Sequence, residues 1–286
     1  MPHTNVGRIP VHLLGPPYRH LEAVNIANPT HPKEGGWAMT WNLGSTRWRD
    51  GDPVVTGRLA GISLVVILPD GHDRLSVLRI LRLIERTRPQ VVLPHHQGPS
   101  PREIASVVRR PPTSLASSVT DYLEWRGVPL EPGTRNIVRR TIELSDRVQT
   151  IAALARNLYM SRRALGRRLL GQELPVPSHW LQIARILRAT TKLQNSDASL
   201  FSIATSLGYP DGFSLSNQMK RLCGIRPLEA RRRLGWEWLF EIWLARETHL
   251  GTLPASVFFA RPSIVASGST DRGKTHVFSP SSAASL

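Results

Sequence analysis

The feature that most constrains the fold of this chain is a pair of helix-turn-helix patterns, which lie between residues 150 and 231 and are joined by one amphipathic segment. In each pattern, a residue suited to cap a helix precedes a run whose apolar residues are three and four positions apart. Small Ala155 in the first pattern lets its two helices approach each other closely. The two patterns predict a mainly helical C-terminal domain with two similar halves.

The first pattern covers residues 150–170. Thr150 can cap its first helix, residues 158–160 form the turn, and Ser161 can cap its second helix. The positions that face the core are Ile151, Leu154, Ala155, Leu165 and Leu169. Four arginines and no acidic residue belong to the second helix: Arg162, Arg163, Arg167 and Arg168. Because like charges at these spacings repel each other, contacts with phosphates or guanine edges would relieve the repulsion.

The second pattern begins at Ser199 and repeats the plan. Gly208 supplies the left-handed backbone of a helix C-cap, Pro210 stops the first helix, and Asp211 can cap the next one. The buried positions of that next helix are Leu215, Met219, Leu222 and Cys223. Its outward positions are Phe213, Ser216, Asn217 and Lys220.

The segment between the two patterns, residues 178–194, has apolar residues at helical spacing: Trp180, Ile183, Ala184 and Leu187. Its seventeen residues, at 1.5 Å each, would form a rod of roughly 25 Å. Such a rod could hold two recognition helices about one duplex turn apart, roughly 34 Å. Both helices would then enter the major groove on one face of the DNA.

This order of helix-turn-helix, long connector and second helix-turn-helix resembles the DNA-binding domain of the AraC/XylS family of bacterial transcription regulators. The resemblance is carried mainly by Ile203-Ala204, residues 207–211, Lys220-Arg221, residues 224–227 and Arg231, and it covers about residues 135 to 233. It implies a sequence-specific transcription regulator that is not an enzyme and reads adjacent major-groove segments of double-stranded DNA. The chain departs from the family pattern at Phe213, where the family has a small polar residue, and at Asn217, where it has an arginine.

The residues expected to contact DNA lie on the two second helices. In the first unit they are Ser161, Arg162, Arg163, Gly166 and Arg167, and in the second they are Gly212, Phe213, Ser216, Asn217 and Lys220. Arg185 and Lys220 are candidates for contacts with phosphate. No catalytic residue, metal ligand or cofactor is predicted, because the chain lacks metal-ligand histidine spacing and glycine-rich nucleotide loops.

The distribution of charge agrees with a DNA-binding C-terminal domain. The formal net charge is +16, and residues 134–247 contribute +10 of it through 19 basic and 9 acidic residues. One cysteine excludes an internal disulfide and fits a reducing cytoplasm. No apolar run is long enough to cross a membrane. We therefore expect a cytoplasmic protein without a membrane partner; RNA polymerase and a second copy of the chain are further candidate partners.

The remaining sequence predicts three further regions. Residues 1–57 show no sustained period and are expected to be an irregular, disordered N-terminal arm. Residues 58–132 are expected to form a small α/β module, in which the apolar run 61–68, a helix over 74–88 and a second apolar run at 90–93 make a β-α-β unit. The DNA-binding domain follows at 134–247. A disordered tail is expected over 248–286.

The input to the small α/β module is not readable from its sequence. Asp70 follows an apolar strand, as in a receiver domain, but the required lysine is missing, because no lysine occurs between Lys33 and Lys192. A turn role for Asp70 is the simpler interpretation. His95-His96 has no nucleophile or acid motif beside it. The sequence therefore identifies neither a small-molecule effector nor a catalytic site.

Three alternatives stay open on the sequence alone. A sequence-tolerant, architectural DNA-binding protein would also be basic, but it would lack a large specificity ratio. A DNA-repair alkyl transferase fused to such a domain would need a thiolate, and the one candidate is Cys223 on a core-facing position. The apolar run 234–244 carries Trp236, Phe240 and Trp243 on one face, which could pack within the chain or form a dimer seam.

Overall fold

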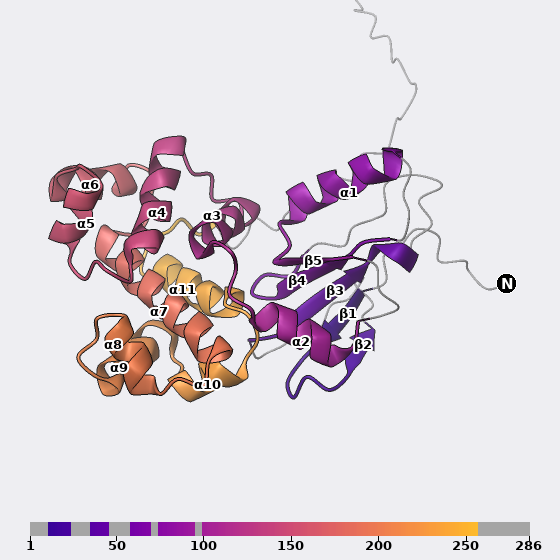
Figure 1. The fold of residues 1–286 in the computed structure, drawn as a ribbon. Helices are drawn as coiled ribbons and strands as arrows, with labels where there is room; N and C mark the ends of the chain where they lie inside the picture. Colours follow the sequence, from indigo (N-terminus) through magenta and orange to yellow (C-terminus); the bar gives the residue numbers. More distant parts are fainter. Residues whose placement is uncertain (1–10, 24–34, 46–57, 70–73, 95–98, 257–286) are drawn as a thin grey trace, which may run out of the picture.

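The computed structural model describes residues 11–23, 35–45, 58–69, 74–94 and 99–256. They form two parts that lie side by side, a sheet with helices against it and a larger group of helices (Figure 1). No helix in these residues is long and apolar enough to cross a membrane.

The first part is built on a five-stranded mixed sheet with the order β2-β1-β3-β4-β5. The strands are β1 (Val11–Leu14), β2 (Leu21–Ala23), β3 (Ala38–Asn42), β4 (Ser63–Ile67) and β5 (Val91–Leu93). β1 pairs antiparallel with β2 and β3, whereas β3, β4 and β5 are parallel neighbours.

Helices α1 (Arg74–Thr87) and α2 (Pro101–Arg109) cover opposite faces of this sheet. Leu64 and Val66 of β4 share a core with Ile80 and Leu83 of α1, whereas Val65 points into a second core with α2. Side chains that alternate between two buried faces explain why β4 reads as a continuous apolar run. The predicted β-α-β unit is confirmed, with β4 and β5 parallel.

The prediction of an irregular arm over residues 1–57 is wrong for the described part of that segment, because β1, β2 and β3 lie there. These strands are only three to five residues long, and most of their side chains are buried. A short strand buried on both faces lacks the apolar-polar alternation that reveals a strand in a sequence. Trp41 belongs to the sheet core rather than to an exposed aromatic surface.

The second part contains all the remaining helices of the described residues, arranged around α7 (Figure 1). They are α3 (Leu115–Trp125), α4 (Pro132–Leu144), α5 (Ile151–Asn157), α6 (Arg162–Leu170), α7 (Pro177–Asn195), α8 (Leu200–Ser206), α9 (Gly212–Cys223), α10 (Pro227–Arg232) and α11 (Glu237–His249). One core cluster contains buried side chains from all of these helices. The short helix α10 has no counterpart among the predicted elements.

Two of the predicted domain limits differ from this arrangement. Helix α3 was expected in the small α/β module, but its side chains Val119, Tyr122 and Leu123 belong to the core of the helical part. The predicted tail over 248–286 begins too early, because Leu253 is buried and Thr252 Oγ1 donates to Glu247 Oε2 over 2.6 Å. The rest of that tail, from residue 257, lies outside the described residues.

A buried polar network joins the sheet part to the helical part. Arg58, just before β4, places Nη2 3.5 Å from Glu237 Oε1 of α11, and the two side chains are 2% and 1% exposed. The second Glu237 oxygen accepts a hydrogen bond of 2.8 Å from Ser63 Oγ. Arg58 Nη1 donates to the carbonyl oxygens of Thr87 and Arg88. Burial lowers the pKa of Arg58, which Glu237 partly offsets.

A second branch of this interface network runs through helix α3. The amide of Gly61 donates to the Tyr122 hydroxyl over 2.8 Å, and that hydroxyl donates to Glu241 Oε1 over 2.7 Å. Arg126 Nε binds the same carboxylate oxygen at 2.7 Å. The network therefore ties β4 to α3 and α11 through polar contacts that are largely shielded from water.

The aromatic side chains of the 234–244 run pack within the chain. Phe240 and Trp243 stack at a centroid distance of 5.4 Å, and Trp243 meets Trp180 of α7 edge-on at 4.9 Å. Trp236 contacts Phe240 and Tyr122. Because Trp236, Phe240 and Trp243 are at most 2% exposed, this face is used in the core of one chain and cannot form a dimer seam.

We expect Glu237→Gln to lower the free energy of unfolding by about 3–5 kcal/mol, because it leaves Arg58 as a buried charge without a partner. Glu143→Gln is the matched control, since Glu143 pairs with Arg140 at 2.9 Å on the surface. Its loss should cost less than about 1 kcal/mol. Urea unfolding of both variants measures the difference. Equal losses would contradict a dominant role for the buried pair.

Candidate nucleic-acid interface

The first helix-turn-helix unit consists of α5 and α6, and both of its predicted caps are present. The Thr150 hydroxyl accepts from the Ala153 amide over 3.2 Å, and the Ser161 hydroxyl accepts from the Ala164 amide over 3.1 Å. These bonds satisfy amides that the first turn of a helix leaves unpaired. Leu165 and Leu169 are at most 1% exposed. The direction of α6 is therefore fixed at its start by a cap and along its length by two leucines.

The outward face of α6 carries the predicted arginines. Arg162, Arg163 and Arg167 are exposed, and none of them forms an ion pair within the described residues. Arg168 differs, because its Nη2 lies 3.2 Å from Glu131 Oε2 at the start of α4. The repulsion expected among four arginines is thus relieved for one of them inside the chain. The other three remain available to an anionic partner.

Gly166 lies on the same side of α6. A Cβ atom placed on Gly166 would meet nothing within 4 Å. A glycine in the middle of a helix lowers stability relative to alanine, and nothing in the surrounding chain requires one here. The open space above Gly166 is compatible with close approach of a partner to the helix backbone.

The second unit consists of α8 and α9 and follows the predicted turn chemistry. Gly208 has φ +74°, and its Cβ would collide with the side chain of Gln149, so glycine is required there. The Asp211 carboxylate accepts from the Ser214 amide over 2.7 Å and caps α9. This hydrogen bond lowers the pKa of Asp211. The charged carboxylate then suits the positive end of the helix dipole.

The outward face of α9 is less charged than that of α6. Phe213 is 74% exposed, Asn217 and Lys220 are exposed, and Ser216 is half-buried. Gly212, also predicted to contact DNA, lies against Leu200 of α8, with its Cβ position 3.1 Å from that side chain. The structure thus places four of the five predicted residues on one accessible side and gives Gly212 a packing role between α8 and α9.

Helix α7 supports both units and is more buried than its sequence pattern suggests. It has 19 residues, which corresponds to roughly 28 Å. Beyond the predicted apolar face, Leu181, Ile186, Ala189 and Leu193 are also buried. The α5–α6 and α8–α9 units lie near its two ends, on the side of the molecule away from the sheet (Figure 1).

Two arginines of α7 bind the two halves of the helical part rather than an external phosphate. Arg185 Nε and Nη2 both donate to the Leu207 carbonyl at the end of α8, over 3.1 and 2.7 Å, and its guanidinium stacks on Tyr209. Arg188 Nε and Nη2 both donate to the Ile142 carbonyl of α4. The expectation that Arg185 touches phosphate is wrong, because its donors are used to hold α8 against α7.

Two exposed aromatic side chains were missed in the sequence. Tyr159, in the turn between α5 and α6, is 98% exposed and has φ +54°. Phe201 of α8 is 62% exposed. An apolar residue beside a helix-turn-helix turn was the available signal, but periodicity alone assigns such a residue to the core. Together with Phe213, these side chains add apolar area next to the basic and polar reading faces.

Further arginines line an open groove of about 1070 Å³ between the sheet part and the C-terminal end of α7. They are Arg19, Arg102, Arg109, Arg110, Arg231 and Arg232, and Asp197 is the one acidic residue of the lining. Arg231 is engaged with the carbonyl oxygens of Ser196 and Ala198. The positive charge of the molecule is therefore not confined to α6.

Comparison with known proteins identifies the fold of this region. Residues 154–233 match the family model of a helix-turn-helix domain. No curated protein is similar enough to the chain to count as a relative.

Several solved structures are similar to part of the chain. The DNA-binding domain of AdpA, a global transcriptional factor in complex with a target DNA, is 28% identical, over 36% of this chain and 91% of that one (TM-score 0.32). A transcriptional regulator with an AraC-type DNA-binding domain from Chromobacterium violaceum is 24% identical, over 35% and 94% (TM-score 0.30). A DNA-binding transcriptional dual regulator from Escherichia coli K-12 is 24% identical, over 36% and 93% (TM-score 0.31).

We expect Gly166→Ala to raise the free energy of unfolding by about 0.5–1 kcal/mol, because alanine loses less conformational entropy in a helix and its methyl group meets open space. The same change should weaken DNA binding, since the methyl group would separate α6 from the duplex. Urea unfolding measures the first effect and gel shifts measure the second. A stabilised variant with unchanged DNA affinity would remove Gly166 from the interface.

Cys223 should be chemically inert in the folded protein. It is 3% exposed, and burial raises the pKa of its thiol to about 12, so the thiol is protonated at pH 8. We expect no reaction with dithiobis(nitrobenzoate) at pH 8 until denaturant is added, and then one thiol per chain. Rapid reaction of the folded chain would revive the alkyl-transferase alternative.

Proposed function

We propose that this chain, which carries an AraC-type helix-turn-helix domain over residues 154–233, is a sequence-specific DNA-binding transcription regulator that reads two adjacent major-groove segments. The observation that carries the proposal is the pairing of two accessible reading faces with one buried connecting helix. Three arginines of α6 lack an ion pair within the described residues, and α9 presents polar and apolar side chains beside its unit's exposed Phe201.

The two helices would contribute to recognition in different ways. Arg162, Arg163 and Arg167 would reach guanine edges and phosphates, because guanidinium groups form bidentate contacts with both. On α9, Asn217 suits adenine and the exposed Phe213 suits a thymine methyl group. Lys220 would supply a contact to phosphate. We infer that α6 provides most of the charge-dependent affinity and that α9 adds base preference.

A sequence-tolerant, architectural DNA-binding protein is the second candidate. The basic groove of about 1070 Å³ favours it, since arginines without base-reading partners bind phosphates irrespective of sequence. The two candidates differ in the ratio of specific to non-specific affinity rather than in the affinity itself. RNA polymerase and a second copy of the chain are proposed as further partners of a regulator, which would act in the cytoplasm. No catalytic role is proposed.

Selection of bound duplexes from a random pool separates the two candidates. We expect a bipartite consensus whose halves are centred about 10 base pairs apart, the spacing of one duplex turn. A single enriched half-site would mean that only one unit reads sequence. Absence of any enriched sequence would support the architectural candidate instead.

We expect Arg163→Ala to weaken binding to the selected duplex by about 1–3 kcal/mol and to relax the preference at one base pair, because one side chain reads one position. Lys220→Ala should weaken binding to selected and scrambled duplexes alike. Gel shifts at fixed salt measure both effects.

Each of these variants has a control that removes the same charge from the same helix. Arg168→Ala serves α6, because Arg168 binds Glu131. Arg221→Ala serves α9, because Arg221 Nη2 bonds back to Gln182 Oε1 over 3.3 Å. If each variant and its control lost the same affinity on every duplex, net charge rather than position would explain binding, and the roles proposed here would be wrong.

A further inference from the structure

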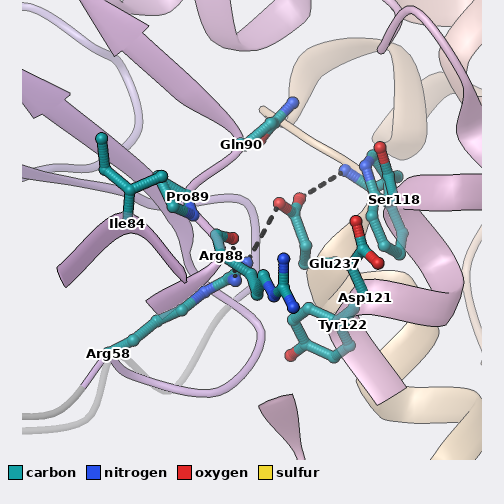
Figure 2. A pocket seen from close by; sticks show the side chains of 10 residues that line it. Arg58, Ile84, Arg88, Pro89, Gln90, Ser118, Asp121, Tyr122 and Glu237 are labelled. Carbon is teal, nitrogen blue, oxygen red and sulfur yellow. Dashed lines mark hydrogen bonds and ion pairs between the residues drawn. The ribbon is translucent and has the colours of Figure 1, made fainter. Parts of the chain in front are cut away.

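A small cavity lies at the seam between the sheet part and the helical part, and the proposed function does not use it. Its volume is about 210 Å³. Arg58, Arg88 and Gln90 line it from the sheet part, and Asp121 of α3 and Glu237 of α11 line it from the helical part (Figure 2). A molecule bound in this cavity would therefore contact both parts of the chain at once.

Three polar atoms of the lining residues have no hydrogen-bond partner among the described residues. They are Arg58 Nε, Trp236 Nε1 and Gln90 Oε1. The side chain of Arg58 and the whole of Trp236 are each 2% exposed. Buried donors are nearly always paired, and an unpaired donor destabilises the folded state. Two donors and one acceptor around the same cavity mark a place built to bind a polar molecule.

The charges around the cavity indicate the kind of molecule. Arg58 and Glu237 neutralise each other at 3.5 Å. Arg88 is drawn toward Glu124 on the surface, at 3.8 Å, and is not bound to Asp121. Asp121 is half-buried and has no ion-pair partner within the described residues. The lining thus offers a carboxylate to a cationic group, and two N–H donors to an acceptor group.

We propose that this cavity binds a small zwitterion of the free amino-acid class, with its carboxylate on Arg58 and Trp236 and its ammonium group on Asp121 and Gln90. The four charged side chains of the lining sum to zero, so a ligand without net charge leaves the site balanced. The faces of Tyr122 and Trp236 provide apolar walls for the rest of the ligand. This site stands apart from the DNA-contacting faces and does not depend on the proposed function.

Titration calorimetry of the full-length protein with each free L-amino acid in turn tests the site. We expect at least one to bind and the matching carboxylic acid and the matching amine to bind much more weakly. Trp236→Phe keeps the ring and removes the N–H donor, and it should weaken binding about three- to tenfold. Asp121→Asn should weaken it about tenfold or more, because the bond it removes is charge-assisted.

Trp180→Phe is the control, because Trp180 Nε1 is also buried without a partner but lies outside the cavity. It should leave the affinity unchanged. If Trp236→Phe fails to fold, the half-buried Asp121→Asn variant still decides the outcome. The proposal is overturned if no amino acid binds at millimolar concentration, if all three variants bind alike, or if a neutral sugar such as glucose binds and amino acids do not.

Discussion

The arrangement of the two parts of this protein depends on the buried ion pair between Arg58 and Glu237. Removing two charges from water costs several kcal/mol each unless their remaining hydrogen bonds are satisfied. Here Glu237 also accepts from Ser63, and the Arg58 guanidinium lies over the rings of Tyr122 and Trp125, at 5.0 and 4.6 Å. The sheet and the helices therefore cannot separate without exposing a charge pair that has no other partners.

Helix α11 carries this constraint into the helical part. One side of α11 supplies Glu237 and Glu241 to the sheet part, and the other side supplies Phe240 and Trp243 to the common core. The same helix contacts α7 and α9. The second helix-turn-helix unit is thus linked to the sheet by a chain of buried contacts, so a change at the seam can reach α9 only through α11.

The two helix-turn-helix units share their caps and core positions but differ on their outer surfaces. α6 presents arginines, whereas α9 presents Phe213 and Asn217 with fewer charges. Electrostatic attraction is long-ranged and insensitive to sequence, whereas apolar and amide contacts need close complementarity. A division of labour between affinity and base preference follows from this difference. Arg185 and Arg188 hold the two units to α7, which keeps their spacing independent of any bound partner.

The sequence by itself determined what depends on local patterns: the caps Thr150, Ser161 and Asp211, the left-handed turn at Gly208, the buried leucines of α6, and the β-α-β unit. Such features depend on residues a few positions apart, so spacing and turn chemistry reveal them. Only the tertiary structure decided that β1 and β3 belong to the sheet, that α3 joins the helical core, that Arg185 serves α8, and that Arg58 meets Glu237. These contacts join distant residues of the chain, and no local period carries information about them.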